Sequence, residues 1–169
     1  MKKTVKALVS ILLIAVMACP MLASAASDEA IPQWEDITLT QEEINEIIAL
    51  NPPVYPDAQA RASGLIIEAC IGISKSGSTL KIYGYTTGSP SVVKCGFKEV
   101  IIQRRANSSS SWTDWVSYED LYADESIYIL SKSLVVTSGY QYQVTCVHYA
   151  KKNILSVQKF DNVSNTLTF

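Results

Sequence analysis

Hydrophobic and polar residues alternate along most of the chain from Gly64 onward, in short runs that are separated by turn residues. An alternation with a period of two is typical of a strand that is buried on one face. Seven such runs at even spacing predict an all-β antiparallel sandwich rather than alternating helices and strands. The clearest run alternates three apolar with three polar side chains, namely Tyr142, Val144 and Cys146 with Gln141, Gln143 and Thr145.

Turn residues place the seven predicted strands. Gly77 and Gly139 lie in two of the turns, and a serine-rich loop covers 106–111. The apolar triplet at 100–102 favours a central strand that is covered on both faces. The predicted strands are 65–74, 79–86, 92–104, 112–118, 127–136, 140–150 and 154–160, and the last one resumes at 166–169.

One short helix is predicted ahead of the sandwich. Thr40 and Glu43 have the spacing of a capping box, isoleucines follow at 44, 47 and 48, and Pro52-Pro53 ends the helix after Asn51. We expect a helix of residues 41–50 inside an acidic leader of residues 26–63, whose end is an extended connector. A helix this short is stable only if it docks on the domain.

The N-terminus has the pattern of a secretory signal. Three lysines precede an uncharged apolar run at 7–18, and Ala23-Ser24-Ala25 supplies the small residues that signal peptidase requires. We expect a signal peptide of residues 1–25, cleavage after Ala25, and a secreted or cell-surface protein with no membrane span in the mature chain. An uncleaved anchor and lipidation at Cys19 are the alternatives.

The charge of the mature chain argues against nucleic acid as a partner. Loss of residues 1–25 removes three lysines and leaves 11 basic against 16 acidic side chains, a formal charge of −5. Proteins that bind polyanions need clustered basic residues, whereas only Arg104-Arg105 and Lys151-Lys152 are paired here. The length from 64 to 169 suits one domain with its own core.

A leucine, a glycine turn and a Tyr-x-Val alternation follow one another between Leu134 and Cys146, in LVVTSGYQYQVTC. This segment resembles the corner between strands E and F of fibronectin type III and other immunoglobulin-like domains, which implies that Tyr142 is the corner tyrosine. Residues 101–115 similarly resemble the C to C′ hairpin. The whole layout resembles small exported proteins of Gram-positive bacteria whose domain families carry no assigned function.

The resemblance does not carry over the usual disulfide, because Val144 stands where immunoglobulin domains have the second cysteine. The mature chain has three cysteines, an odd number, so at least one thiol is unpaired in a monomer. All three lie in apolar runs and fit small buried side chains. If one pair forms, we favour a disulfide between Cys95 and Cys146.

Catalytic and metal-binding patterns are sparse. His148 is the only histidine and there is no G-x-S-x-G motif, so the one remaining nucleophilic arrangement is a dyad of Cys146 and His148 on one strand face. Residues two apart on a core strand are commonly mere neighbours, and we favour that interpretation. We expect His148 at a strand end with a hydrogen-bond partner. We predict that the protein is not an enzyme and holds no cofactor and no metal. We interpret the densest group of carboxylates as part of a solvated loop, namely Asp114, Glu119, Asp120, Asp124 and Glu125.

Aromatic side chains are the strongest candidates for a binding surface. Exposed rigid rings beside carboxylates suit stacking on sugars or anchoring a protein interface. We therefore predict a non-catalytic binding or adhesion module whose extracellular ligand is a cell-wall glycan or a protein. The alternatives are a structural subunit of a surface assembly and, third, a small hydrolase. The predicted contact residues are Trp112, Trp115, Tyr118, Tyr122, Tyr83 and Tyr85.

Overall fold

The computed structural model describes residues 32–56 and 64–169, which belong to one compact unit. The predicted signal peptide, its cleavage site, Cys19 and most of the connector lie outside the described residues. Within the described ranges, no helix is long and apolar enough to cross a membrane.

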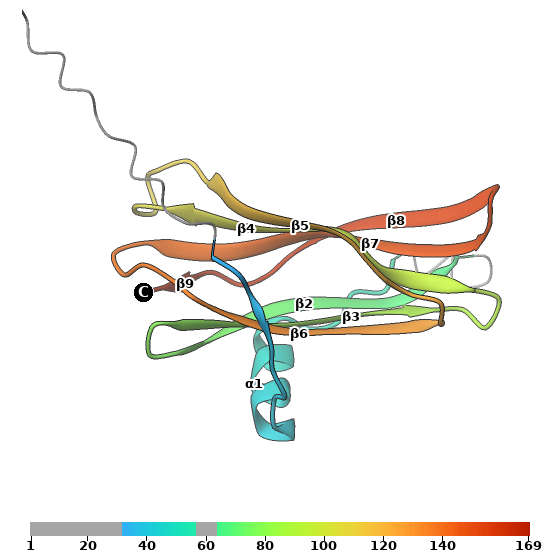
Figure 1. Cartoon of the computed structure of the whole chain (residues 1–169), viewed down its shortest axis with the longest axis horizontal. Coiled ribbons are helices and arrows are strands. Elements are labelled where there is room, and N and C mark those ends of the chain that lie inside the picture. The colour runs from blue at the N-terminus through green and yellow to red at the C-terminus, as the bar shows by residue number, and fades with distance from the viewer. Residues whose placement is uncertain (1–31, 57–63) are drawn as a thin grey trace, which may run out of the picture. The chain divides into compact units, whose positions relative to one another are not determined.

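Two antiparallel sheets pack face to face as a sandwich (Figure 1), as the alternation predicted. The four-stranded sheet has the order β1-β6-β3-β2, with β1 at Glu35–Asp36, β6 at Ile127–Val135, β3 at Thr79–Gly88 and β2 at Ile66–Ser76. The five-stranded sheet has the order β5-β4-β7-β8, with β5 at Thr113–Ala123, β4 at Lys94–Arg105, β7 at Gln141–Asn153 and β8 at Ser156–Val163. Strand β9, at Leu167–Thr168, pairs with β7 beyond the end of β8.

All seven predicted strands are present, with three differences. The seventh begins at Ser156, because Ile154 and Leu155, which were predicted to be strand, form the turn before it. The two-residue strand β1 was not predicted, because it is too short to show an alternation. Strand β5 continues to Ala123, so the expected acidic loop is strand over its first half. There Lys98 and Asp120 lie between the paired residues Phe97–Leu121 and Glu99–Glu119 and form an ion pair of 2.5 Å.

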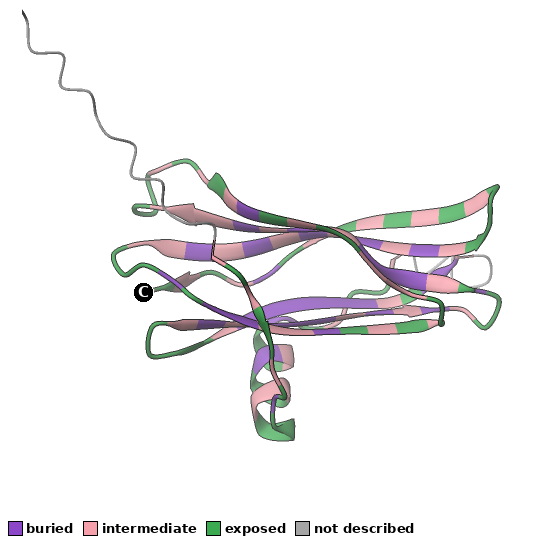
Figure 2. Cartoon of the chain, in the orientation of Figure 1, coloured by how far each residue is buried: buried purple, intermediate pink, exposed green. Residues whose placement is uncertain are grey.

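The core lies between the inner faces of the two sheets, and burial changes residue by residue along the strands (Figure 2). In β7, Tyr142, Val144 and Cys146 are buried as predicted, and the residues between them are half-buried. The apolar triplet of β4 divides differently from the prediction: Val100 and Ile102 are in the core, whereas Ile101 lies on the outer face.

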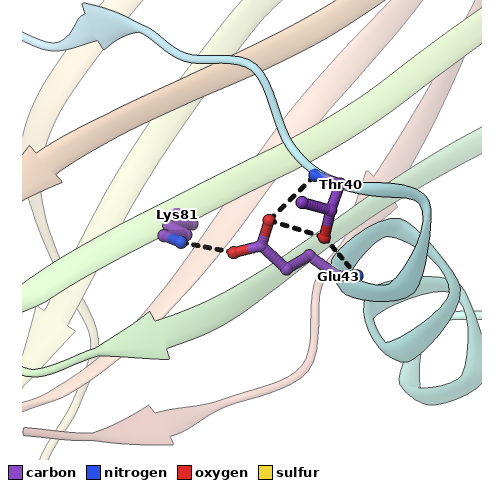
Figure 3. Close-up of polar contacts among 3 residues, drawn as sticks. All are labelled: Thr40, Glu43 and Lys81. Atoms are coloured by element: carbon purple, nitrogen blue, oxygen red, sulfur yellow. Dashed lines mark hydrogen bonds and ion pairs between the residues drawn. The ribbon is translucent and has the colours of Figure 1, made fainter.

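Helix α1, at Gln41–Leu50, forms where it was predicted and has the capping box. The Glu43 carboxylate accepts the backbone N–H of Thr40 at 2.8 Å and also binds the Lys81 Nζ atom of β3 at 2.5 Å (Figure 3). Figure 1 shows α1 on the face of the four-stranded sheet that points away from the other sheet. Fully buried Ile47 packs there with Tyr83.

Asn51 fixes the end of the helix to both sheets. Its Nδ2 atom donates to the Ile47 carbonyl at 2.9 Å and to the Asn165 Oδ1 atom at 3.0 Å, and its Oδ1 atom accepts the Asn165 N–H at 2.6 Å. The Asn165 Oδ1 atom also accepts the N–H of Ile73 in β2. The described part of the leader is therefore integrated into the sandwich.

Candidate functional site

Two of the predicted contact residues point into the protein. Trp115 packs on Tyr142 of the core, with ring centroids 5.5 Å apart. Tyr118 stacks on Trp34 at 3.5 Å with nearly parallel rings, and its hydroxyl donates to the Pro32 carbonyl. The stacked rings of Tyr118 and Trp34 hold the segment before β1 against the sandwich.

Tyr83 and Tyr85 lie on the outer face of the four-stranded sheet, but this face is not open. Helix α1 covers Tyr83, which is buried, and Tyr85 packs at the edge of the same cluster. The Tyr85 hydroxyl donates to the Glu68 carboxylate at 2.7 Å. The expectation that these two rings form an exposed contact surface is thus corrected, because the docking of the helix could not be read from the strand pattern.

The remaining two predicted residues lie on the outer face of the five-stranded sheet. Trp112 packs on the Arg105 guanidinium, 4.2 Å from the ring centroid. Tyr122 lies beside Tyr149, with centroids 4.7 Å apart, and its hydroxyl donates to Asp120. Tyr149 was not predicted as a contact residue.

Gly96 allows the two tyrosines to meet. It lies on β4 between Tyr122 of β5 and Tyr149 of β7 in the strand register. Its φ is +151°, and a Cβ atom there would be 2.0 Å from the Leu121 carbonyl oxygen. The missing side chain leaves a gap in the row, and the rings of the two outer strands close over it.

A groove of about 370 Å³ adjoins the tyrosine pair on the same face. Two neighbouring cross-strand rows line it, and each has one residue from β4, one from β7 and one from β8. These rows are Glu99, Val147 and Asp161, and Ile101, Thr145 and Val163. The lining is therefore mostly apolar, with Thr145 beside Val147 in the middle and carboxylates at two corners of the groove.

The first of these rows is acidic beyond the groove as well. Glu119 of β5 lies directly opposite Glu99, which places three carboxylates in one row across four strands. Glu99 accepts a hydrogen bond of 3.3 Å from the Ser117 hydroxyl. An apolar trough beside carboxylates favours a ligand that combines a cation with an aliphatic body. The sequence did not reveal this site, because its residues are neighbours only through the strand register.

Cys146 and His148 do approach each other, with Sγ and Nε2 3.4 Å apart. His148 is fully buried in the middle of β7 and not at a strand end, which corrects the expectation. The Thr86 hydroxyl donates its hydrogen to the Gly96 carbonyl at 2.8 Å. The hydroxyl oxygen of Thr86 is also 2.8 Å from the His148 Nδ1 atom, and it can only accept there, so Nδ1 carries the proton.

Burial keeps both members of this pair neutral. It lowers the pKa of His148 to about 3 and raises the pKa of the Cys146 thiol. A nucleophilic thiolate paired with an imidazolium needs the opposite shifts and access to solvent. The arrangement is that of a polar network inside the core, which Asn162 extends toward the β8 side.

The predicted disulfide between Cys95 and Cys146 is wrong. All three described cysteines are free and buried. Cys95 lies opposite Ala150 in the β4–β7 pairing, whereas Cys146 lies opposite Val100. The two thiols are thus displaced by four residues along the strands, about 13 Å at roughly 3.3 Å per residue. A disulfide tolerates a Cα separation of only about 7 Å.

The five acidic residues between Asp114 and Glu125 do not converge on one point. Asp120 and Asp124 form ion pairs with Lys98 and Lys94, and Asp114 accepts a hydrogen bond from Gln103. Within the described ranges, no three His, Cys, Asp or Glu side chains are grouped so that they could hold a metal ion.

Comparison with known proteins returns no match: no protein-family model, no curated protein and no solved structure matches the chain. The function is therefore inferred from the geometry of the site.

Proposed function

We propose that this protein is an exported, non-catalytic binding module that contacts its ligand through the outer face of the five-stranded sheet. The observation that carries the proposal is the groove between Ile101, Val147 and Val163, which Glu99 and Asp161 flank and the Tyr122–Tyr149 pair adjoins. On the other outer face, α1 covers the part around Tyr83.

We further propose that the sandwich is of the fibronectin type III class. Two features support this. The strand order β2-β3-β6 opposite β5-β4-β7-β8 corresponds to strands A, B and E opposite C′, C, F and G. The Tyr142 hydroxyl donates to the Thr137 carbonyl at 3.0 Å, five residues upstream, as a corner tyrosine does.

The ligand class follows from the lining of the groove. Apolar side chains favour an aliphatic group, and the carboxylates favour an ammonium or guanidinium group. A protein segment in which basic and aliphatic residues adjoin has both. In this proposal the extracellular partner is a protein.

A methyl NMR titration with hexylammonium tests the site, with hexanoate as the probe of equal length and opposite charge. We expect hexylammonium to shift the methyl signals of Ile101, Val147 and Val163, with binding that weakens as salt is added. Glu99→Gln combined with Asp161→Asn should remove the preference for the cation. Glu35→Gln combined with Glu46→Gln, on exposed residues of β1 and α1, is the control. Equal shifts with both probes, or none in the groove, would overturn the proposal.

A cell-wall glycan is the second candidate ligand, because Trp112 lies on the same outer face against Arg105. Co-sedimentation with isolated cell walls, comparing the unmodified protein with Trp112→Ala, tests it. Pelleting that Trp112→Ala abolishes would favour a glycan, and the absence of pelleting would exclude this candidate.

A further inference from the structure

The tip of the β7–β8 hairpin exposes two large aliphatic side chains. Ile154 is 88% exposed and Leu155 is 97% exposed, more than any other large hydrophobic residue of the described chain. The turn itself does not need them, because the Asn153 side chain supplies its hydrogen bond by accepting the N–H of Leu155 at 3.0 Å. The tip therefore carries apolar surface that the fold does not use.

Lysines flank this aliphatic tip. Lys151 and Lys152 directly precede the turn on β7. Among the described residues, neither of these lysines forms an ion pair, whereas Lys94 nearby binds Asp124. The tip thus combines aliphatic side chains with cationic neighbours.

The groove on the five-stranded sheet has the complementary composition, a mostly apolar lining beside the acidic row of Glu119, Glu99 and Asp161. We infer that the hairpin tip of one copy of this protein docks into the groove of a second copy. This inference rests on the proposed function of the groove and names the partner of that site.

The tip cannot reach the groove of its own chain. Val147 in the groove and Ile154 at the tip are seven residues apart along one hairpin, which is roughly 23 Å of extended strand. The occupant must come from another molecule. Tip and groove are different surfaces, so each copy offers one of each and the contact is head to tail.

Sedimentation equilibrium of the purified protein over a wide concentration range tests this. We expect reversible self-association that weakens with salt. Ile154→Ser combined with Leu155→Ser, and separately Glu99→Lys combined with Asp161→Lys, should each weaken the association constant by about tenfold or more. All four side chains are exposed or half-buried, so these variants should keep the fold, and circular dichroism checks this.

Two controls match these changes at other sites. Ile129→Ser alters an aliphatic residue of β6 that is 60% exposed, and Glu35→Lys with Glu46→Lys makes the same charge change away from the groove. Neither should alter association. A mixture of the tip variant and the groove variant should associate again, because the intact tip of one meets the intact groove of the other.

Three results would overturn the inference: an unmodified protein that stays monomeric, control variants that weaken association as much as the test variants, or folded tip and groove variants whose mixture fails to associate. A monomeric protein whose groove still binds hexylammonium would overturn self-docking alone. A monomeric protein that also ignores hexylammonium would overturn the proposed function with it.

Discussion

At the scale of single residues, the buried His148 couples folding to pH. Its pKa is about 3 in the folded protein and about 6.5 when unfolded, so between these values only the unfolded chain binds the proton. The contribution of His148 to the free energy of unfolding is therefore fully present above pH 6.5. Below that pH the free energy of unfolding falls by roughly 1.4 kcal/mol for each pH unit, down to the folded pKa.

Urea unfolding between pH 7 and pH 5 measures this effect while most carboxylates remain ionised. The unmodified protein should lose stability across this range. His148→Gln, which keeps an amide donor near Thr86 but has no titrating group, should lose much less. Equal losses in the two proteins would show that His148 is not the group responsible.

The buried thiols give a second prediction at this scale. Burial raises the pKa of both Cys70 and Cys95 to about 11, and that of Cys146 is raised as well. A thiol reagent at neutral pH should leave all three unmodified in the folded protein and modify all three in denaturant. The mass measured without reductant reports any disulfide, and an oxidised pair would contradict the free thiols.

At the scale of elements, the docking of α1 depends on one side chain. Ile47 is fully buried between the helix and the four-stranded sheet. Ile47→Ala should lower the free energy of unfolding by about 2–4 kcal/mol. The matched control is Leu50→Ala on the same helix, because Leu50 is 63% exposed and its truncation should cost little. Similar losses in both variants would mean that the helix does not pack as described.

The elements also show what the sequence can and cannot predict. The capping box and the strand alternations are local, and they predicted α1 and seven strands. The groove is not local, since Glu99 and Asp161 become neighbours of Val147 only through the register of three strands. The burial of Tyr83 under α1 and the burial of His148 beside Phe97 likewise depend on which elements pack together.

At the scale of the whole molecule, the two outer faces differ. One is covered by α1 around Tyr83, whereas the other carries the groove and the tyrosine pair. Removing residues 26–51 should therefore expose the face of Tyr83 and Tyr85, lower the melting temperature and increase the binding of a hydrophobic dye. An unchanged melting temperature would indicate a leader that is independent of the domain.

The hydrogen bonds between Asn51 and Asn165 also determine when, during synthesis of the chain, α1 can dock on the sandwich. These residues are 114 positions apart, and Asn165 follows β8 along the chain. A ribosome must therefore release the chain through β8 before α1 can gain these bonds, although it makes the helix more than a hundred residues earlier. The helix should be the last part of the fold to lock, and a chain cut short before Asn165 would leave it loosely held.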